Sequence, residues 1–171
     1  MPTMILTVSC PTFAADPFDV DVDLGTDDIE DALTTHGVDS ADDYSIEGGV
    51  LVLGRPRDPH YKDLTGAQAI DAVEAFRRAG EECANVTVAC FEAAITDGGY
   101  SPTESDWRDL ECRFMALTGT PKCYVREYYA ECGDPLPEWA KRYIDWDSLV
   151  EDFRSEVETI DTPAGLLILS Y

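Results

Sequence analysis

The N-terminal segment alternates between apolar and polar residues, the pattern of a strand with one buried face. Residues 3–10 form a first strand-like run and residues 18–24 a second, strictly alternating one. In the second run the apolar side chains point to one side, at Phe18, Val20, Val22 and Leu24. The carboxylates point to the other side, at Asp19, Asp21 and Asp23. We expect two strands, the second with a wet row of carboxylates about 6.6–6.8 Å apart, close to the phosphate separation along a DNA strand.

A short acidic helix is predicted next. We predict a helix over residues 27–36, with Thr26 as its N-cap and Gly37 as the residue that ends it. The first turn of this helix is rich in carboxylates, which suits the positive end of the helix dipole.

Two short segments, residues 44–47 and 50–53, flank Gly48 and Gly49. A Gly-Gly pair between such runs is typical of a hairpin turn. The following segment, residues 54–63, contains two prolines and is expected to form a linker.

The middle of the chain has helical periodicity. Thr65 and Gln68 form a capping box for a helix that ends at Gly80. Its inward face is predicted to hold Ile70, Val73 and Phe76. Residues 83–95 fit either a strand or a helix, and this alternative stays open.

Ser101 then caps a helix with Pro102 at its first position, and Gly119 ends it. The residues predicted to point inward from this helix are Trp107, Leu110, Phe114 and Leu117. A further helix is expected over residues 124–132.

Two short helices and a hairpin complete the pattern. The helices are predicted over residues 137–143 and, capped by Asp145, up to residue 153. Residues 156–170 are predicted to form a hairpin around the turn at 162–165.

This order of elements predicts an α+β fold: an elongated chain of two to three small modules with short sheets and helices. We place an acidic N-terminal α+β module at residues 1–58, a middle helical module at 59–100 and a C-terminal module at 101–171.

The composition combines an ordinary share of hydrophobic residues with a strong negative charge. Hydrophobic residues make up 44% of the 171 residues, which is enough for a core, but 35 Asp and Glu face 12 Lys and Arg, a net charge of -23. Self-repulsion of this size costs stability. Three explanations are open: a saline environment, a cation-binding surface, or imitation of a nucleic acid. At the charge density of B-DNA, this charge would cover about 40 Å of duplex. A DNA-binding role is not expected, because no basic stripe exists to neutralise phosphates.

The distribution of charge favours a dedicated surface. Residues 1–54 hold 12 acids and no Lys or Arg, and residues 145–171 hold 7 acids and one base. The stretch between them is closer to balance, with 16 acids and 11 bases. A halophilic protein would be expected to spread its acids evenly. The 21 Asp, against 14 Glu, and the 3 Lys, against 9 Arg, nevertheless keep the halophilic interpretation open.

The candidate metal site is the Asp19-x-Asp21-x-Asp23 run, with Glu30 at the twelfth position as in a calcium loop. The sixth position is Leu24, where such loops have glycine, and the alternation predicts a strand. We therefore expect no metal site and no cofactor, and keep a calcium-binding regulator as an alternative.

Enzyme chemistry is not indicated. His36 and His60 lie beside no nucleophile motif, and no Walker loop, dinucleotide fingerprint or H-E-x-x-H motif occurs. Aromatic residues gather near the C-terminus, which predicts core or oligomer-interface packing more than base stacking. They are Tyr124, Tyr128, Tyr129, Trp139, Tyr143 and Trp146.

A cytoplasmic location is expected, because the N-terminus lacks a basic signal-peptide region and no apolar stretch approaches the length of a membrane span. The cysteines form no C-x-x-C pair and follow no zinc spacing, so we expect reduced, mostly buried thiols. They are Cys10, Cys83, Cys90, Cys112, Cys123 and Cys132.

Two stretches of the C-terminal half resemble a known family. Residues 91–94 with 99–107 resemble an F-x-x-A-x-x-G-x-Y-x-S-x-E-D stretch, and residues 136–146 with 150–152 resemble an L-P-x-x-L-x-x-Y-I-D-Y…A-R-D signature. Both belong to the ArdA-type antirestriction proteins, and the match covers roughly residues 91–171. This chain has Val150-Glu151-Asp152 where the family usually has Ala-Arg-Asp.

The resemblance implies a phage-, plasmid- or transposon-borne, dimeric DNA mimic made of three modules. Such proteins occupy the DNA groove of type I restriction–modification enzymes. The N-terminal module here is short and lacks the expected aromatic-rich opening, so retargeting to another defence complex, such as a CRISPR effector (an anti-CRISPR role), is the alternative.

The charge pattern and the resemblance together predict a non-catalytic acidic protein that inhibits a DNA-binding defence complex as a homodimer. It is expected to bind neither nucleic acid nor membrane. Its predicted partner-binding residues are Asp19, Asp21, Asp23, Asp27, Asp28, Glu30, Asp31, Asp42, Asp43, Asp145, Asp147, Glu151, Asp152, Glu156 and Glu158.

Overall fold

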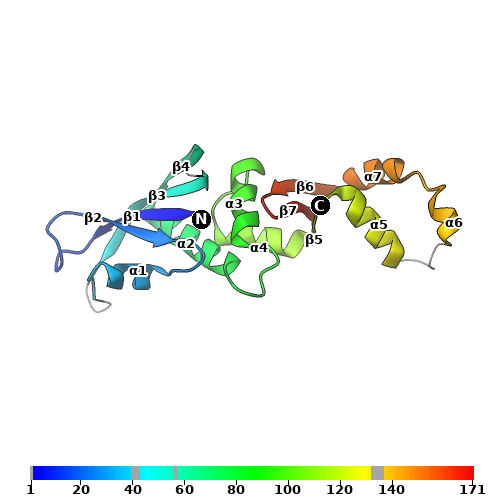
Figure 1. Ribbon diagram of the computed structural model, residues 1–171. Helices are drawn as coiled ribbons and strands as arrows, with labels where there is room; N and C mark the ends of the chain where they lie inside the picture. Colours follow the sequence, from blue (N-terminus) through cyan, green and yellow to red (C-terminus); the bar gives the residue numbers. More distant parts are fainter. Residues whose placement is uncertain (1, 40–42, 56–57, 132–136) are drawn as a thin grey trace. The chain divides into compact units, whose positions relative to one another are not determined.

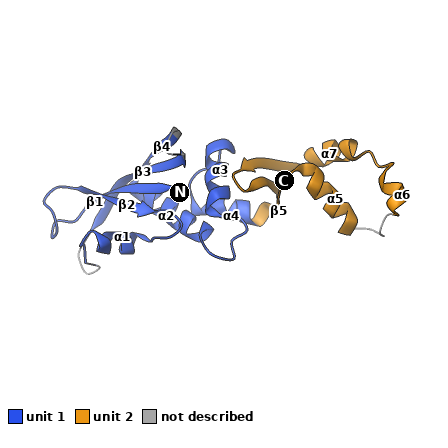
Figure 2. Ribbon diagram, viewed as in Figure 1, with its two compact units in different colours: residues 1–111 blue, residues 112–171 orange. Residues whose placement is uncertain are grey.

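The computed structural model describes residues 2–39, 43–55, 58–131 and 137–171. It divides into two compact units, Met1–Glu111 and Cys112–Tyr171, which are shown in two colours in Figure 2. Each unit combines helices with a small antiparallel sheet, which confirms the predicted α+β class.

Unit 1 is built on a four-stranded antiparallel sheet in the order β2-β1-β3-β4. Its strands are β1 (Thr3–Ser9), β2 (Phe18–Asp23), β3 (Ser45–Arg55) and β4 (Asp58–Thr65). The two strands predicted at the N-terminus are thus confirmed. One face of the sheet is buried and consists of Met4, Leu6, Val8, Val20, Val22, Leu51, Leu53 and Leu64.

Two helices cover this buried face (Figure 1). Helix α1 (Ile29–Thr35) packs against β2, and helix α2 (Gly66–Ala79) packs mainly against β3 and β4. The predicted capping box of α2 is present, and the helix ends at Gly80. Ile70 does not point inward as predicted. It is 47% exposed, because the core face of α2 is formed by its alanines together with Val73 and Phe76.

The cap of α1 differs from the prediction. Asp28 is the N-cap residue, and its carboxylate accepts a hydrogen bond of 2.8 Å from the backbone N–H of Asp31. Thr26 instead donates its hydroxyl to the Asp23 carbonyl oxygen at 3.1 Å. The helix therefore begins two residues later than predicted, and Gly37 follows its end with a φ of 89°.

The hairpin predicted at Gly48 and Gly49 is wrong, because both glycines lie inside the continuous strand β3. A Cβ on Gly49 would lie 3.1 Å from both the Ala69 Cβ and the Met4 Sδ, so glycine permits close packing of α2 and β1 here. The predicted linker is also wrong, since most of it forms β4, which pairs with β3 throughout its length.

Two further helices complete unit 1. Helix α3 (Val88–Asp97) resolves the ambiguous segment as helical, and its Phe91 ring lies 4.9 Å from that of Phe76 on α2. Helix α4 (Glu104–Arg113) follows. Its Glu111 carboxylate accepts hydrogen bonds from the backbone N–H groups of Asn85 and Val86, at 3.1 and 2.9 Å, and so fixes the segment before α3.

Unit 2 contains a three-stranded antiparallel sheet in the order β5-β7-β6. Its strands are β5 (Phe114–Thr118), β6 (Val157–Thr162) and β7 (Gly165–Ser170), so the predicted C-terminal hairpin is confirmed. The helix predicted to run to Gly119 ends at Arg113, because the next residues pair with β7.

Three helices accompany this sheet: α5 (Pro121–Glu131), α6 (Glu138–Lys141) and α7 (Trp146–Arg154). Asp145 caps α7 as predicted. Helices α5 and α7 pack together through Tyr124 and Phe153, whose rings are 5.1 Å apart.

The predicted aromatic cluster is only partly a packing feature. Tyr128 stacks near Tyr124, with ring centroids 6.1 Å apart, but is itself 47% exposed. Trp139 and Tyr143 are 64% and 78% exposed. The aromatic residues of this unit therefore lie largely at its surface.

The unit boundary lies in the last turn of α4, whereas we predicted boundaries after residues 58 and 100. The first predicted boundary falls at the start of β4, inside the sheet, and the second separates α3 from α4 of the same unit. Of the described cysteines, Cys10 and Cys90 are buried free thiols. The other three are exposed, contrary to the prediction, at Cys83, Cys112 and Cys123. Cys132 lies outside the described residues.

Candidate partner-binding surface

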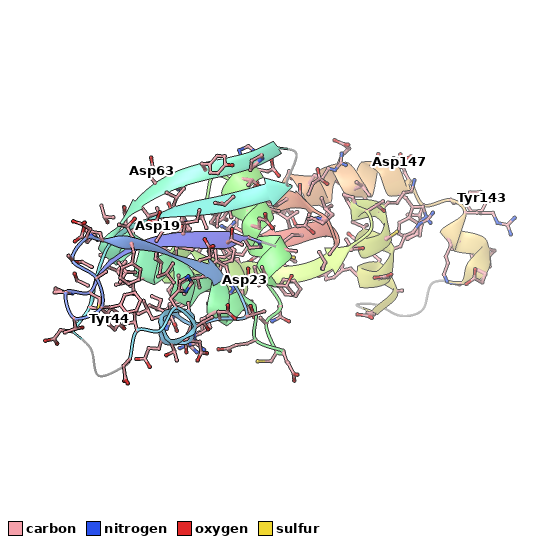
Figure 3. The ribbon with its side chains drawn as sticks, turned by 60° about the vertical axis from the view of Figure 1, so that its left-hand side comes forward. Asp19, Asp23, Tyr44, Asp63, Tyr143 and Asp147 are labelled. Carbon is pink, nitrogen blue, oxygen red and sulfur yellow. The ribbon has the colours of Figure 1, made fainter. Side chains whose placement is uncertain are left out.

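The predicted carboxylate row exists on strand β2. Its three aspartates are exposed on the side of the sheet that faces away from α1 and α2, whereas Val20 and Val22 between them are fully buried. Because all three lie on one face of one strand, neighbouring carboxylates are about 6.6–6.8 Å apart along the strand. Figure 3 shows Asp19 and Asp23 near the two ends of β2. Asp19 also accepts a hydrogen bond of 3.2 Å from the Thr7 hydroxyl.

The register of the sheet adds a residue that sequence reasoning missed. Asp21 pairs with Ile5 on β1, Ile5 with Val50 on β3, and Val50 with Asp63 on β4. Directly paired residues point to the same face of an antiparallel sheet, so Asp63 lies on the same open face as Asp21. Three strand spacings separate them, which amounts to about 14 Å.

The sequence around Asp63 indicates a strand only weakly. Asp63 precedes the buried Leu64, which fits strand alternation, but two nearby prolines favoured a linker. Strand β4 tolerates Pro59 because it is an edge strand, where a missing N–H costs little.

Between the two edges, the open face is apolar and half-exposed. Ile5, Val50 and Val52 are neither buried nor fully exposed, and Tyr61, which pairs with Val52, is 68% exposed. The face thus has an aliphatic centre, a row of three carboxylates along β2, and Asp63 on β4.

The acids around α1 form a second group next to β2. Glu30, Asp31 and Asp43 are exposed and Asp27 is half-buried. Asp28 is exposed but is partly occupied by its capping bond. Asp42, which we also predicted, lies outside the described residues.

Several of the predicted C-terminal acids form ion pairs within unit 2, unlike the acids of β2 in the described part of the chain. Glu158 forms an ion pair with Arg113 and Asp147 with Lys122, both at 2.6 Å. Glu151 lies 3.5 Å from Arg154. Asp152 and Glu156 are exposed and form no ion pair within the described part of the chain.

Asp145 combines exposure with a capping role. Its carboxylate accepts hydrogen bonds from the backbone N–H of Ser148 at 3.1 Å and from the Ser148 hydroxyl at 2.8 Å. These bonds, the backbone bond first, lower the pKa of Asp145 below its ordinary value, because they favour the ionised form. This carboxylate therefore stabilises the start of α7.

The two units differ strongly in charge balance. Unit 1 holds 24 acidic and 6 basic residues, whereas unit 2 holds 11 and 6. Within unit 1, Arg77 and Arg78 of α2 already pair with Glu74 on the same helix and with Glu81 just beyond its end. Of the excess of 18 acids in unit 1, 12 lie in residues 1–54, which include β2 and α1.

The conformation of β2 does not suit the calcium-loop alternative. Asp19, Asp21 and Asp23 follow an extended strand, so they do not wrap around a common centre as loop ligands do. Across the described part of the chain, no three His, Cys, Asp or Glu side chains come together in a way that could hold a metal ion.

The two histidines lie at the end of α1 and on β4. His36 Nδ1 lies 3.0 Å from the Ala32 carbonyl oxygen at the end of α1. His60 is an exposed residue of β4 paired with Leu53.

No known family model, curated protein or solved structure matches the chain. The resemblance to the antirestriction family therefore stays a prediction. Among the described residues, no helix has both the length and the apolar character needed to cross a bilayer.

Proposed function

We propose that this protein is an acidic DNA mimic, which inhibits a DNA-binding defence complex by occupying its basic DNA-binding groove. The proposal rests on one observation above all. Strand β2 presents three carboxylates in a regular row on an exposed face, within a 54-residue stretch that contains no Lys or Arg.

This arrangement suits a basic groove better than it suits a catalytic or metal-binding role. Regularly spaced carboxylates offer a DNA-binding protein the repeating negative charge it otherwise finds in phosphates. The half-exposed aliphatic centre of the same sheet face, with Ile5, Val50 and Val52, can then lose its contact with water when the partner docks.

The proposed target is the methyltransferase core of a type I restriction–modification enzyme, with a CRISPR effector as the second candidate. The C-terminal resemblance favours the first target. A homodimer in the cytoplasm of the host cell is part of the same proposal.

Binding to the methyltransferase core at increasing salt tests this function. We expect affinity to fall steeply as salt rises, because electrostatic attraction between the two surfaces is screened. Affinity that does not change with salt, or no binding even at low salt, would contradict the proposal.

A matched pair of triple variants locates the interaction. Replacing Asp19, Asp21 and Asp23 together by Asn should weaken binding by about tenfold or more. The control changes three other exposed carboxylates to Gln, outside the proposed surface, at Glu82, Glu127 and Glu131. Both variants lose three charges, so equal weakening would show that net charge acts without the β2 row.

A further inference from the structure

A cavity of about 490 Å³ opens in unit 1, on the side of the sheet opposite the β2 carboxylate row. It lies between the start of α1, the start of β3 and helix α2. This volume is within the range of ligand-binding sites, about 300–1,000 Å³. Its apolar lining includes Ile46, Ile70 and Val73, with Tyr44 beside them. Figure 3 shows Tyr44 next to α1.

Ile70, which lies off the core face of α2, forms part of the cavity wall. An isoleucine in the middle of a packed helix is expected to be buried, yet Ile70 is 47% exposed and lines the cavity wall. A ligand with an apolar portion would remove this side chain from water, at a gain of about 25 cal/mol for each Å² buried.

The charged residues of the lining favour a cation. They are three carboxylates and one guanidinium, at Asp28, Glu30, Glu74 and Arg77. Arg77 already donates to both carboxylate oxygens of Glu74, at 2.6 and 2.9 Å, which also raises the pKa of Arg77 above its ordinary value. Glu74 and Arg77 therefore largely neutralise each other.

Two carboxylates, Asp28 and Glu30, lie outside this pair, although Asp28 also interacts electrostatically with Arg77. One oxygen of Asp28 accepts the capping bond from Asp31, so its other oxygen can accept a further bond. Glu30 is exposed and has no ion pair within the described part of the chain. An apolar wall with two carboxylates at its edge matches a side chain that has an aliphatic stem and a cationic end.

We propose that this cavity binds an arginine side chain of the protein partner. The methylene groups of the arginine would pack on Ile70 and Val73, and its guanidinium would bond to Asp28 and Glu30. A planar guanidinium also stacks on aromatic rings such as that of Tyr44, and it is less strongly hydrated than an ammonium. A calcium or magnesium ion fits less well, because it requires six or more oxygen ligands.

This inference rests on the proposed function, since a DNA-binding partner is rich in arginine. It adds a second contact on the helical side of the sheet. Because α1 packs against the edge strand β2, a partner that reaches around this edge contacts both the aspartate row and the cavity.

Titration with N-acetyl-arginine methylamide, followed by NMR of the backbone amides, tests the cavity directly. The shifts should be confined to its lining, namely residues 28–30, 44–46, 70, 73, 74 and 77. N-acetyl-citrulline methylamide has nearly the same shape without the charge and should bind about tenfold more weakly. Equal binding of the two probes, or shifts spread over all acidic segments, would overturn the proposal.

Two substitutions that each add one positive charge test whether the probe binds in this cavity. Ile70→Arg places a guanidinium in the cavity itself and should weaken probe binding about tenfold. Tyr61→Arg is the control, because it makes the same change in charge at a 68% exposed position on the other face of the sheet. Glu30→Gln, at an exposed position, provides a second disruptive variant if Ile70→Arg fails to fold. Probe binding that survives both Ile70→Arg and Glu30→Gln would overturn the proposal.

Partner binding separates this inference from the proposed function. A partner that binds the wild type and Ile70→Arg equally well, but not the β2 triple variant, supports DNA mimicry and overturns the cavity proposal. If the arginine probe binds and no DNA-binding complex does, DNA mimicry fails while the cavity remains a guanidinium site.

Discussion

Individual carboxylates in this protein have two different roles. Asp28, Asp145 and Glu111 accept backbone hydrogen bonds and so hold local structure. Asp21 and Asp23 make no such bond in the described part of the chain and only add negative charge to the surface. The distinction predicts different outcomes when single acids are replaced.

The first prediction concerns pH and Asp145. Its pKa is lowered in the folded state, so the bonds to Ser148 stabilise the protein above the ordinary carboxyl range and are lost as the pH falls through the folded pKa. Asp145→Ala should therefore lower the melting temperature at pH 7, and the gap to the wild type should narrow below about pH 4. Asp152→Ala, in the same helix, is the control. A gap that is constant with pH would contradict the assigned role.

The second prediction concerns Glu111. Its carboxylate accepts hydrogen bonds from two backbone N–H groups and from the Asn85 side chain, and Val86 is completely buried. Glu111→Ala leaves a buried N–H without its acceptor and should lower the free energy of unfolding by about 2 kcal/mol. Chemical denaturation measures the change. Glu82→Ala removes the same charge from an exposed position and should cost less than about 0.5 kcal/mol.

At the scale of elements, some glycines that predict a turn or a helix end lie at close contacts between backbone segments. Gly48 and Gly49 resemble a turn, but Gly49 lets α2 and β1 approach β3 closely, and Gly48 lies close to the Leu64 carbonyl oxygen of β4. Gly80 does end α2 as predicted, yet it also touches the neighbouring loop. A Cβ on Gly80 would lie 2.0 Å from the Gly25 carbonyl oxygen. Gly49 and Gly80 therefore mark close approaches of the backbone in this fold.

The third prediction follows from this contact. Gly80→Ala should destabilise the protein by about 1–3 kcal/mol, because the methyl group has no room and the backbone must shift. Gly119→Ala is a matched control, since no atom lies within 4 Å of its added Cβ. Denaturant titration of both variants measures the difference, and equal stabilities would rule out the close contact.

Local patterns identified many elements because their signals lie in short stretches. The alternation of β2, the capping box at Thr65 and Gln68, and the Asp145 cap each involve neighbouring residues. The remaining features depend on distant residues. Phe114 continues a helical pattern, yet it forms a strand because β7 lies beside it, paired at Leu169. In the same way, the acids of β2 could be predicted, but the position of Asp63 required the sheet register.

At the scale of the whole molecule, the charge is a cost that folding must offset. A net charge of -23 on 171 residues, concentrated in unit 1, creates repulsion among carboxylates of the folded state. Packing must outweigh this repulsion at any salt concentration at which the protein works.

The fourth prediction distinguishes this account from the halophilic interpretation. We expect the protein to be folded at low salt, and its melting temperature to rise as ionic strength goes from about 0.01 to 1 M and the Debye length falls from about 30 to 3 Å. Over the same range, partner binding should weaken. Unfolding at low salt would instead indicate a protein adapted to a saline environment.

Strand β2 stands at the edge of its sheet, and in the described part of the chain no further strand pairs with it. Exposed edge strands tend to join with those of other molecules and so to aggregate, and charged side chains oppose this. The three aspartates of β2 therefore also oppose pairing of this edge strand with the edge strand of another copy. Any variant that neutralises them has to be checked for self-association before its loss of binding is interpreted.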